Sequence, residues 1–268
     1  MTVRGVAMTA LACCIAGCMQ SKPKEEIIQT FPDGSKKTVV YYDGRISNLR
    51  RLLVYYPNGT VQSEHFFTRG KSAWGPPPRN DILSALGIMA NVFSDSVSTV
   101  YYEDGRKRSE VSYEKGLKNG KETIWHPNGQ VKSEAVFIEG QPEGRSVSYF
   151  EDGKPAAEVT FAGGKKDGTE TLYYPSGNKR ELITYVKGNR HGVFRQWWPN
   201  GNMKREEHYT DDVLNGPYTT FHENGKKEET GNYKMGRLDG EKLAWDENGR
   251  LIARANYING EFESGQSY

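Results

Sequence analysis

Histidine offers the easiest chemistry to test against this sequence, because imidazole binds metal ions and serves as a general base. The chain has five histidines: His65, His126, His191, His208 and His222. His126 and His222 occupy the same place in a repeating unit, four units apart. With two strands per unit spaced about 4.8 Å apart, they are predicted to lie roughly 40 Å from each other, which no metal site spans. His191 and His208 fall on different elements of adjacent units. We therefore predict no metal site and no cofactor.

Nucleophiles and paired carboxylates give no better case for catalysis. The serines are scattered without a Gly-x-Ser-x-Gly motif, and no cysteine stands beside a base. Glutamates recur at one place in the unit, mostly two residues after Lys or Arg: Glu110, Glu134, Glu158 and Glu206. We predict that they form a solvated ladder of cross-strand ion pairs, each contributing little. The sequence predicts a protein that is not an enzyme.

The first cysteines instead indicate lipid attachment. Arg4 precedes an apolar stretch from Gly5 to Ile15, which is too short to span a membrane. The segment Ile15-Ala16-Gly17-Cys18 resembles the bacterial lipobox, in which the cysteine is diacylated and becomes the mature N-terminus. An ordinary secretory signal or a cytosolic N-terminus is the alternative.

On the lipoprotein interpretation, residues 1–17 are the signal peptide and 18–25 a lipidated linker. Cys18 would carry fatty acyl chains such as palmitate, which anchor an exported protein to the cell envelope. Met19 stands where lipoproteins kept at the inner membrane carry Asp, which favours the outer membrane if the cell is diderm. The membrane is therefore one predicted partner.

The amino-acid composition argues against nucleic acid as a partner and favours one class of fold. Lys and Arg number 36 against 34 Asp and Glu, a net charge of +2, which gives no electrostatic footprint for nucleic acid. Only 35% of the residues are hydrophobic, yet there are 16 Tyr and 30 Gly. This composition is typical of thin β-repeat proteins that pack rings between strands and have no deep centre.

A 24-residue period dominates the chain from Val97 onward. Seven units begin at residues 97, 121, 145, 169, 193, 217 and 241, and positions below are counted from these starts. Position 9 is always glycine, from Gly105 to Gly249. Position 5 is always aromatic: Tyr101, Trp125, Tyr149, Tyr173, Trp197, Phe221 and Trp245. So is position 17: Tyr113, Phe137, Phe161, Tyr185, Tyr209, Tyr233 and Tyr257.

Each unit reads as a β-hairpin. Asn-Gly or Asp-Gly pairs such as Asn128-Gly129 supply the positive φ of a tight turn, and both flanking runs are rich in Thr, Val, Tyr and Trp. Positions 15 and 17 share one face, and positions 12 and 14 point the other way and are mostly charged, which predicts one buried and one wet face. A Gly-x-x-x-Gly turn, as from Gly140 to Gly144, leads to the next hairpin.

The predicted fold is therefore all-β: an elongated, twisted antiparallel sheet of tandem 24-residue hairpin repeats with one short helical insert. The seven units cover residues 97–264, two imperfect repeats cover 26–74, and 265–268 form a tail. The insert, residues 75–96, has a Pro-rich start and an apolar helical stripe: Ile82, Ala85, Leu86, Met89 and Phe93. It packs on the sheet or serves as a docking helix.

The aromatic rows are the candidate binding surface. Position 5 rings are expected in the core, whereas position 6, on the opposite face, also carries rings. This second row is either half-covered packing or a binding stripe for protein, peptide or glycan. The candidate residues are Tyr102, His126, Phe150, Tyr174, Trp197, Trp198, Tyr218 and His222. The last strand, expected to end near Tyr257, is an edge that Arg254, Glu261 and Glu263 guard or that accepts a partner's strand.

The aromatic pair before Pro/Glu-Asn/Asp-Gly, the second aromatic eight residues after that glycine, and the closing Gly-x-x-x-Gly resemble the MORN repeat family. The chain more closely resembles the bacterial variant found in YwqK-type antitoxin proteins, firmly over 97–264 and loosely over 26–74. The resemblance implies a scaffold that binds a protein partner, such as a toxin that it neutralises. A lipobox departs from a cytoplasmic antitoxin, so an immunity role would operate in the envelope. A glycan- or cell-wall-binding lipoprotein is the alternative function.

Overall fold

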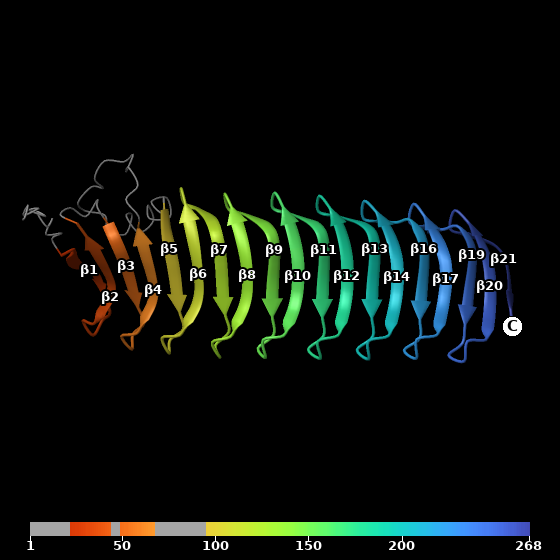
Figure 1. The fold of residues 1–268 in the computed structure, drawn as a ribbon, viewed down its shortest axis with the longest axis horizontal. Coiled ribbons are helices and arrows are strands. Elements are labelled where there is room, and N and C mark those ends of the chain that lie inside the picture. The colour runs from red at the N-terminus through yellow and green to blue at the C-terminus, as the bar shows by residue number, and fades with distance from the viewer. Residues whose placement is uncertain (1–21, 44–48, 68–94) are drawn as a thin grey trace, which may run out of the picture.

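The computed structural model describes residues 22–43, 49–67 and 95–268. Within these residues the chain is all-β and forms one open sheet of 21 strand segments, which Figure 1 shows side by side in sequence order along a long axis. The predicted fold class is confirmed for this part of the chain. Cys18 and residues 75–94 of the predicted helical insert lie outside the described residues, and residues 95 and 96 begin a strand.

The strands before the regular array are β1 (Lys24–Thr30), β2 (Lys36–Tyr42), β3 (Leu49–Tyr55) and β4 (Val61–Phe67). Two strands then come from each unit: β5 (Asp95–Tyr101), β6 (Lys107–Glu114), β7 (Leu117–Trp125), β8 (Val131–Ile138), β9 (Gln141–Tyr149), β10 (Pro155–Ala162), β11 (Lys165–Tyr173), β12 (Lys179–Val186), β13 (Asn189–Trp197) and β14 (Met203–Thr210). The array ends with β15 (Val213–Leu214), β16 (Gly216–Phe221), β17 (Lys227–Lys234), β18 (Arg237–Leu238), β19 (Gly240–Trp245), β20 (Leu251–Ile258) and β21 (Glu261–Ser267).

The sheet is a meander in which strands adjacent in the chain pair antiparallel. β15 with β16, and β18 with β19, are single strands interrupted at Asn215 and Asp239, since both parts pair with the same neighbour. The edges among the described residues are β1 and β21. The expected last strand near Tyr257 is therefore followed by one more, and the predicted tail contributes residues 265–267 to it.

The two turns of each unit have different geometry. The lower turn of a unit, at the bottom in Figure 1, joins its two strands, and the upper turn leads to the next unit. At the lower turn Gly105 has φ +85°, but Asp104 does not have positive φ. The expectation that Asp or Asn supplies a positive φ is therefore wrong. Instead the Asp104 carboxylate accepts the backbone N–H of Arg106 at 2.9 Å. The Gly105 N–H donates to the Tyr102 carbonyl, and the Tyr102 N–H to the Arg106 carbonyl, which is the three-residue hairpin loop that ends on a left-handed glycine.

The tight two-residue turn lies at the other end of the strands. Glu139 and Gly140 have φ of 49° and 82°, as a type I′ turn requires. The Gly140 N–H donates at 2.8 Å to the carbonyl of Lys118, which lies in β7 just after the preceding upper turn. The same bond recurs along the array, so successive upper turns are tied together.

Burial in the array corrects the prediction of one buried and one wet face. Face A, which carries positions 15 and 17, and face B, which carries positions 5 and 14, both bear rings, and nearly all these rings are half-buried. A single-layer sheet has nothing stacked on it, so rings on each face cover their neighbours instead. Among the described residues, β2 and β3 bury consecutive hydrophobic residues, Val39 with Val40 and Leu52 with Leu53, and β5 buries Ser98 with Thr99.

Candidate functional site

The ring row at position 6 is bonded to the neighbouring unit. Each polar ring tip meets the backbone carbonyl of position 5 in the next unit. The pairs are Tyr102 Oη to Trp125 (2.7 Å), His126 Nε2 to Tyr149 (2.9 Å), Tyr174 Oη to Trp197 (2.9 Å), Trp198 Nε1 to Phe221 (3.1 Å) and His222 Nε2 to Trp245 (2.9 Å). Because a carbonyl only accepts, the two histidines carry their proton on Nε2. Phe150 has no polar tip.

The other predicted site residues do not form one patch with this row. Trp197 ends β13 and Trp198 begins the turn, so the two neighbouring rings project to opposite faces. Tyr218 is only 6% exposed. Its hydroxyl donates to Glu229 at 2.5 Å, and burial, followed by this bond, raises the pKa of the phenol. The predicted surface is thus divided between face B and face A, and on face A Tyr218 is buried.

A second ladder runs beside the first and was missed from the sequence. Asn128, Asn200 and Asn224, at position 8, donate from Nδ2 to the carbonyl of position 7 in the next unit, at 2.7, 2.9 and 2.8 Å. The same side chains accept the N–H two residues later. The recurrence of Asn at one position was the available signal. The Asn side chain at position 8 joins neighbouring units and also shapes the turn.

The cross-strand ion pairs predicted for position 14 are confirmed for Glu134, Glu158 and Glu206, although their partners come from elsewhere in the unit, whereas Glu110 pairs with Lys107 of its own strand. Glu134 pairs with Lys121 (2.6 Å), and Glu206 with Arg195 (2.6 Å). Position 12 takes no part because the register skips it: Ile124 faces Ser133 and Trp125 faces Val131, which leaves Lys132 as a bulge. A bulge redirects its side chain, so the prediction that positions 12 and 14 share a face is wrong.

The position 12 cations lie on face A beside the position 6 rings. The Arg108 guanidinium is 5.9 Å from the Tyr102 ring centroid, and Lys204 Nζ is 4.3 Å from that of Trp198. Arg108 and Lys132 border a surface depression of about 520 Å³ that also involves Tyr102, Glu122 and Ile124. Glu122 is already paired with Lys118 at 2.6 Å. The depression therefore has two cations and no unpaired carboxylate.

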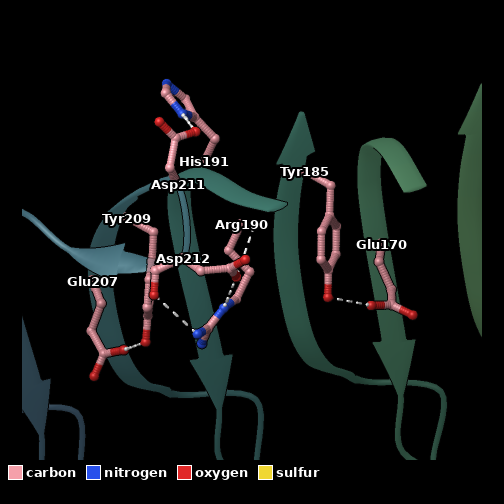
Figure 2. A network of polar contacts seen from close by, with 8 residues as sticks. All are labelled: Glu170, Tyr185, Arg190, His191, Glu207, Tyr209, Asp211 and Asp212. Carbon is pink, nitrogen blue, oxygen red and sulfur yellow. Dashed lines mark hydrogen bonds and ion pairs between the residues drawn. The ribbon is translucent and has the colours of Figure 1, made fainter. Parts of the chain in front are cut away.

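Figure 2 shows a network of polar contacts on β11 to β14 and the following turn. Arg190 lies over the Tyr209 ring at 4.3 Å and donates to Asp212 at 2.9 Å. This bond, with a second from the Arg190 backbone, lowers the pKa of the Asp212 carboxyl. Asp211 and Asp212 replace the usual X-Gly of the upper turn, with φ of 49° and 68°. Arg190 thus neutralises a turn that lacks its glycine.

The other polar side chains of this network also have hydrogen-bond partners. Tyr209 Oη donates to Glu207 at 2.9 Å, and Tyr185 Oη to Glu170 at 3.1 Å. His191 Nδ1 lies 3.4 Å from Asp211. In the described part of the chain no three His, Cys, Asp or Glu side chains gather as metal ligands would. The described residues also contain no helix that is long and apolar enough to cross a membrane.

Comparison with known proteins identifies the repeat. The sequence pattern of the MORN repeat variant matches seven segments that together exceed half of the chain: 52–68, 118–139, 142–162, 166–187, 190–211, 214–235 and 238–259. No curated protein matches the sequence.

Two solved structures illustrate how distant the structural matches are. The first, TcdB2-TccC3 without its hypervariable C-terminal region, is 12% identical with a TM-score of 0.23, over 87% of this chain and 14% of that one. A porin-like protein from Bacteroides uniformis ATCC 8492 is 11% identical with a TM-score of 0.20, over 84% of this chain and 87% of that one. Likeness at this level carries no argument about function.

Proposed function

The chain belongs to the MORN repeat variant family, and from this membership and the open faces of its sheet we propose that it is a non-enzymatic scaffold that binds a protein partner at the cell envelope. One observation carries the proposal: the positions that bond to the next unit differ from the positions that vary most at the centre of face A. Position 6 bonds to the next unit in five units, and position 8 does so in three. A repeat array that keeps neighbour contacts while varying the side chains of one face builds an extended binding surface.

The variation is concentrated at the centre of face A, where position 2 lies opposite position 15. These cross-strand pairs are of six kinds in seven units, since only units one and three share Ser with Val: Ser98/Val111, Glu122/Ala135, Ser146/Val159, Glu170/Ile183, Phe194/Glu207, Tyr218/Gly231 and Lys242/Ala255. Phe194, Glu207 and Tyr218 are themselves buried, so this variation changes the shape of face A. We assign face A as a whole to partner recognition.

We further propose that the partner is a toxin-like protein and that the chain is an immunity protein of the YwqK-like type. Acylation of Cys18 would hold it in the envelope, outside the compartment in which cytoplasmic toxins act. The anchor is tested apart from binding. Cells grown with a labelled fatty acid should incorporate the label into the wild-type chain and retain it in the membrane fraction. The Cys18→Ala variant should do neither, and equal labelling of both would remove Cys18 from the proposal.

Partner binding is tested by capturing the tagged, detergent-solubilised full chain from its native envelope and identifying stoichiometric companions by mass spectrometry. One protein retained at equal stoichiometry, and shown to bind again after purification, supports the scaffold. Retention of peptidoglycan or polysaccharide without any protein would favour the second candidate, a glycan-binding lipoprotein. The half-buried ring rows on both faces are the observation that keeps this candidate in view.

A further inference from the structure

The basic side chains at unit position 12 form a row on face A. Four of the first five units have Arg or Lys there: Arg108, Lys132, Arg180 and Lys204. Each is the residue that the strand register skips, so each occupies an equivalent bulge. The third, sixth and seventh units have Ala156, Glu228 and Ile252 instead. The row therefore belongs to the first five units.

Among the described residues these cations lack close carboxylate partners, as do Lys179, Lys227 and Lys234, whereas many other basic residues of the strands are paired. Lys118, Lys121, Arg145, Lys166, Arg190, Arg195 and Lys242 each lie within 3.0 Å of an acid. Across the described ranges no carboxylate is within ion-pair distance of Arg108, Lys132 or Lys204, and Arg180 has only a contact of 3.8 Å to the adjacent Glu181. Two of the four instead lie over position 6 rings. The row thus offers positive charge beside flat apolar surface.

The spacing of the row defines what can bind along it. Successive units are two strands apart, so Arg108 and Lys132, like Arg180 and Lys204, are separated by about 9.6 Å along the sheet axis. Ala156 interrupts the row and leaves about 19 Å between Lys132 and Arg180. A polyproline II segment rises about 3.1 Å per residue and repeats its side every three residues, or about 9.3 Å. Such a segment presents every third side chain to the same row. It also packs well on aromatic rings.

We propose that the position 12 row is the docking surface for an acidic segment of the protein partner, held in the polyproline II conformation with carboxylates three residues apart. This proposal rests on the proposed scaffold function and specifies the chemistry of the partner segment that face A binds. A nucleic acid duplex fits less well, since the phosphates of each strand follow at about 3.4 Å along its axis, far more densely than the cations. The chain's net charge of +2 also gives little general attraction for polyanions or for anionic membranes.

The test uses fluorescent peptides and anisotropy titrations with the full chain in detergent. One peptide has Glu at every third residue with Pro between, and a second has the same number of Glu at alternate residues. The first should bind more tightly, and added salt should weaken it. The Arg108→Gln, Lys132→Gln, Lys204→Gln variant should lose about tenfold or more in affinity.

The matched control, Lys179→Gln, Lys227→Gln, Lys234→Gln, removes the same charge from exposed lysines outside the row and should retain affinity. Absence of binding, equal affinity for both peptides, or equal loss in both variants would overturn the proposal. Anionic vesicles or single-stranded DNA that bind as tightly through the same residues would do so as well, since the row would then be a general anion surface. A captured partner that still binds the row variant would remove this docking site and leave the scaffold function standing.

Discussion

The first four units and the two that follow them use the same backbone but fill face A differently. In units one and three, Ser98 and Ser146 lie opposite valines. In units five and six the same positions carry Phe194 and Tyr218, both nearly buried. The larger rings are matched by changes on the facing strand: Arg205 lies over Phe194 at 4.8 Å, and Gly231 lies opposite Tyr218. The comparison teaches that bonds between units are fixed, while face A changes by compensated pairs.

The largest expected effect breaks one of these pairs. A Cβ on Gly231 would lie 2.6 Å from Tyr218 Cε1, so Gly231→Ala should overpack the ring and cost about 1–3 kcal/mol of unfolding free energy. Without this clash the substitution should stabilise the strand by about 0.5–1 kcal/mol. The sign of the change in unfolding free energy, measured by urea unfolding, therefore shows whether the clash occurs.

The control for this pair places a small residue on the facing strand. In the Tyr218→Ser background, which copies units one and three, Gly231→Ala should be neutral or stabilising. Destabilisation of the same size in both backgrounds would show that the two residues are not coupled.

A smaller effect is expected from the bonds that all units share. Tyr174→Phe keeps the ring but removes the donor to the Trp197 carbonyl, and should cost about 0.5–1.5 kcal/mol. Phe150 lacks such a donor, so Phe150→Tyr should stabilise the chain by a similar or smaller amount. Thermal unfolding of both variants tests the role of the row. An unchanged melting temperature in both variants would mean that these hydrogen bonds stabilise the fold no more than hydrogen bonds to water do.

The smallest effect concerns the Asp211-Asp212 turn of unit five. The folded-state pKa of Asp212 is lowered, chiefly by its bonds with Arg190. A lowered pKa contributes stability that is present above the unfolded-state value and is lost as pH falls through the folded-state value. Acid unfolding curves of wild type should therefore show slightly more loss below the ordinary Asp range than those of Asp212→Asn. Superimposable pH profiles after normalisation would contradict this.

Much of the fold was readable from the sequence because its signals repeat. Glycine at position 9 and rings at positions 5 and 17 recur in seven units, and their period alone predicts stacked hairpins. The two turns were harder, since Asn128-Gly129 has the composition of a tight type I′ turn yet forms a three-residue loop. Glu139-Gly140, with weaker composition, forms the type I′ turn instead. Turn type here depends on the register that both neighbouring hairpins impose.

The candidate site was less predictable because one bulge reverses a side chain. Strict alternation puts Lys132 on the same face as Glu134, whereas the skipped register places it on face A beside the depression. The alternation of side chains also could not reveal that Tyr174 and His126 hydrogen-bond to backbone carbonyls of the next unit. These bonds link residues 23 apart in the chain and depend on how units stack.

Lysine reactivity in the presence of the captured partner tests the central claim, recognition through face A, most directly. The purified complex and the free chain would be acetylated briefly and compared by mass spectrometry. We expect the partner to protect Lys132 and Lys204, while Lys121 on face B and the exposed Lys179 keep their reactivity. Protection of Lys121 and Lys179 with Lys132 and Lys204 unchanged would contradict the account and move recognition to the opposite face.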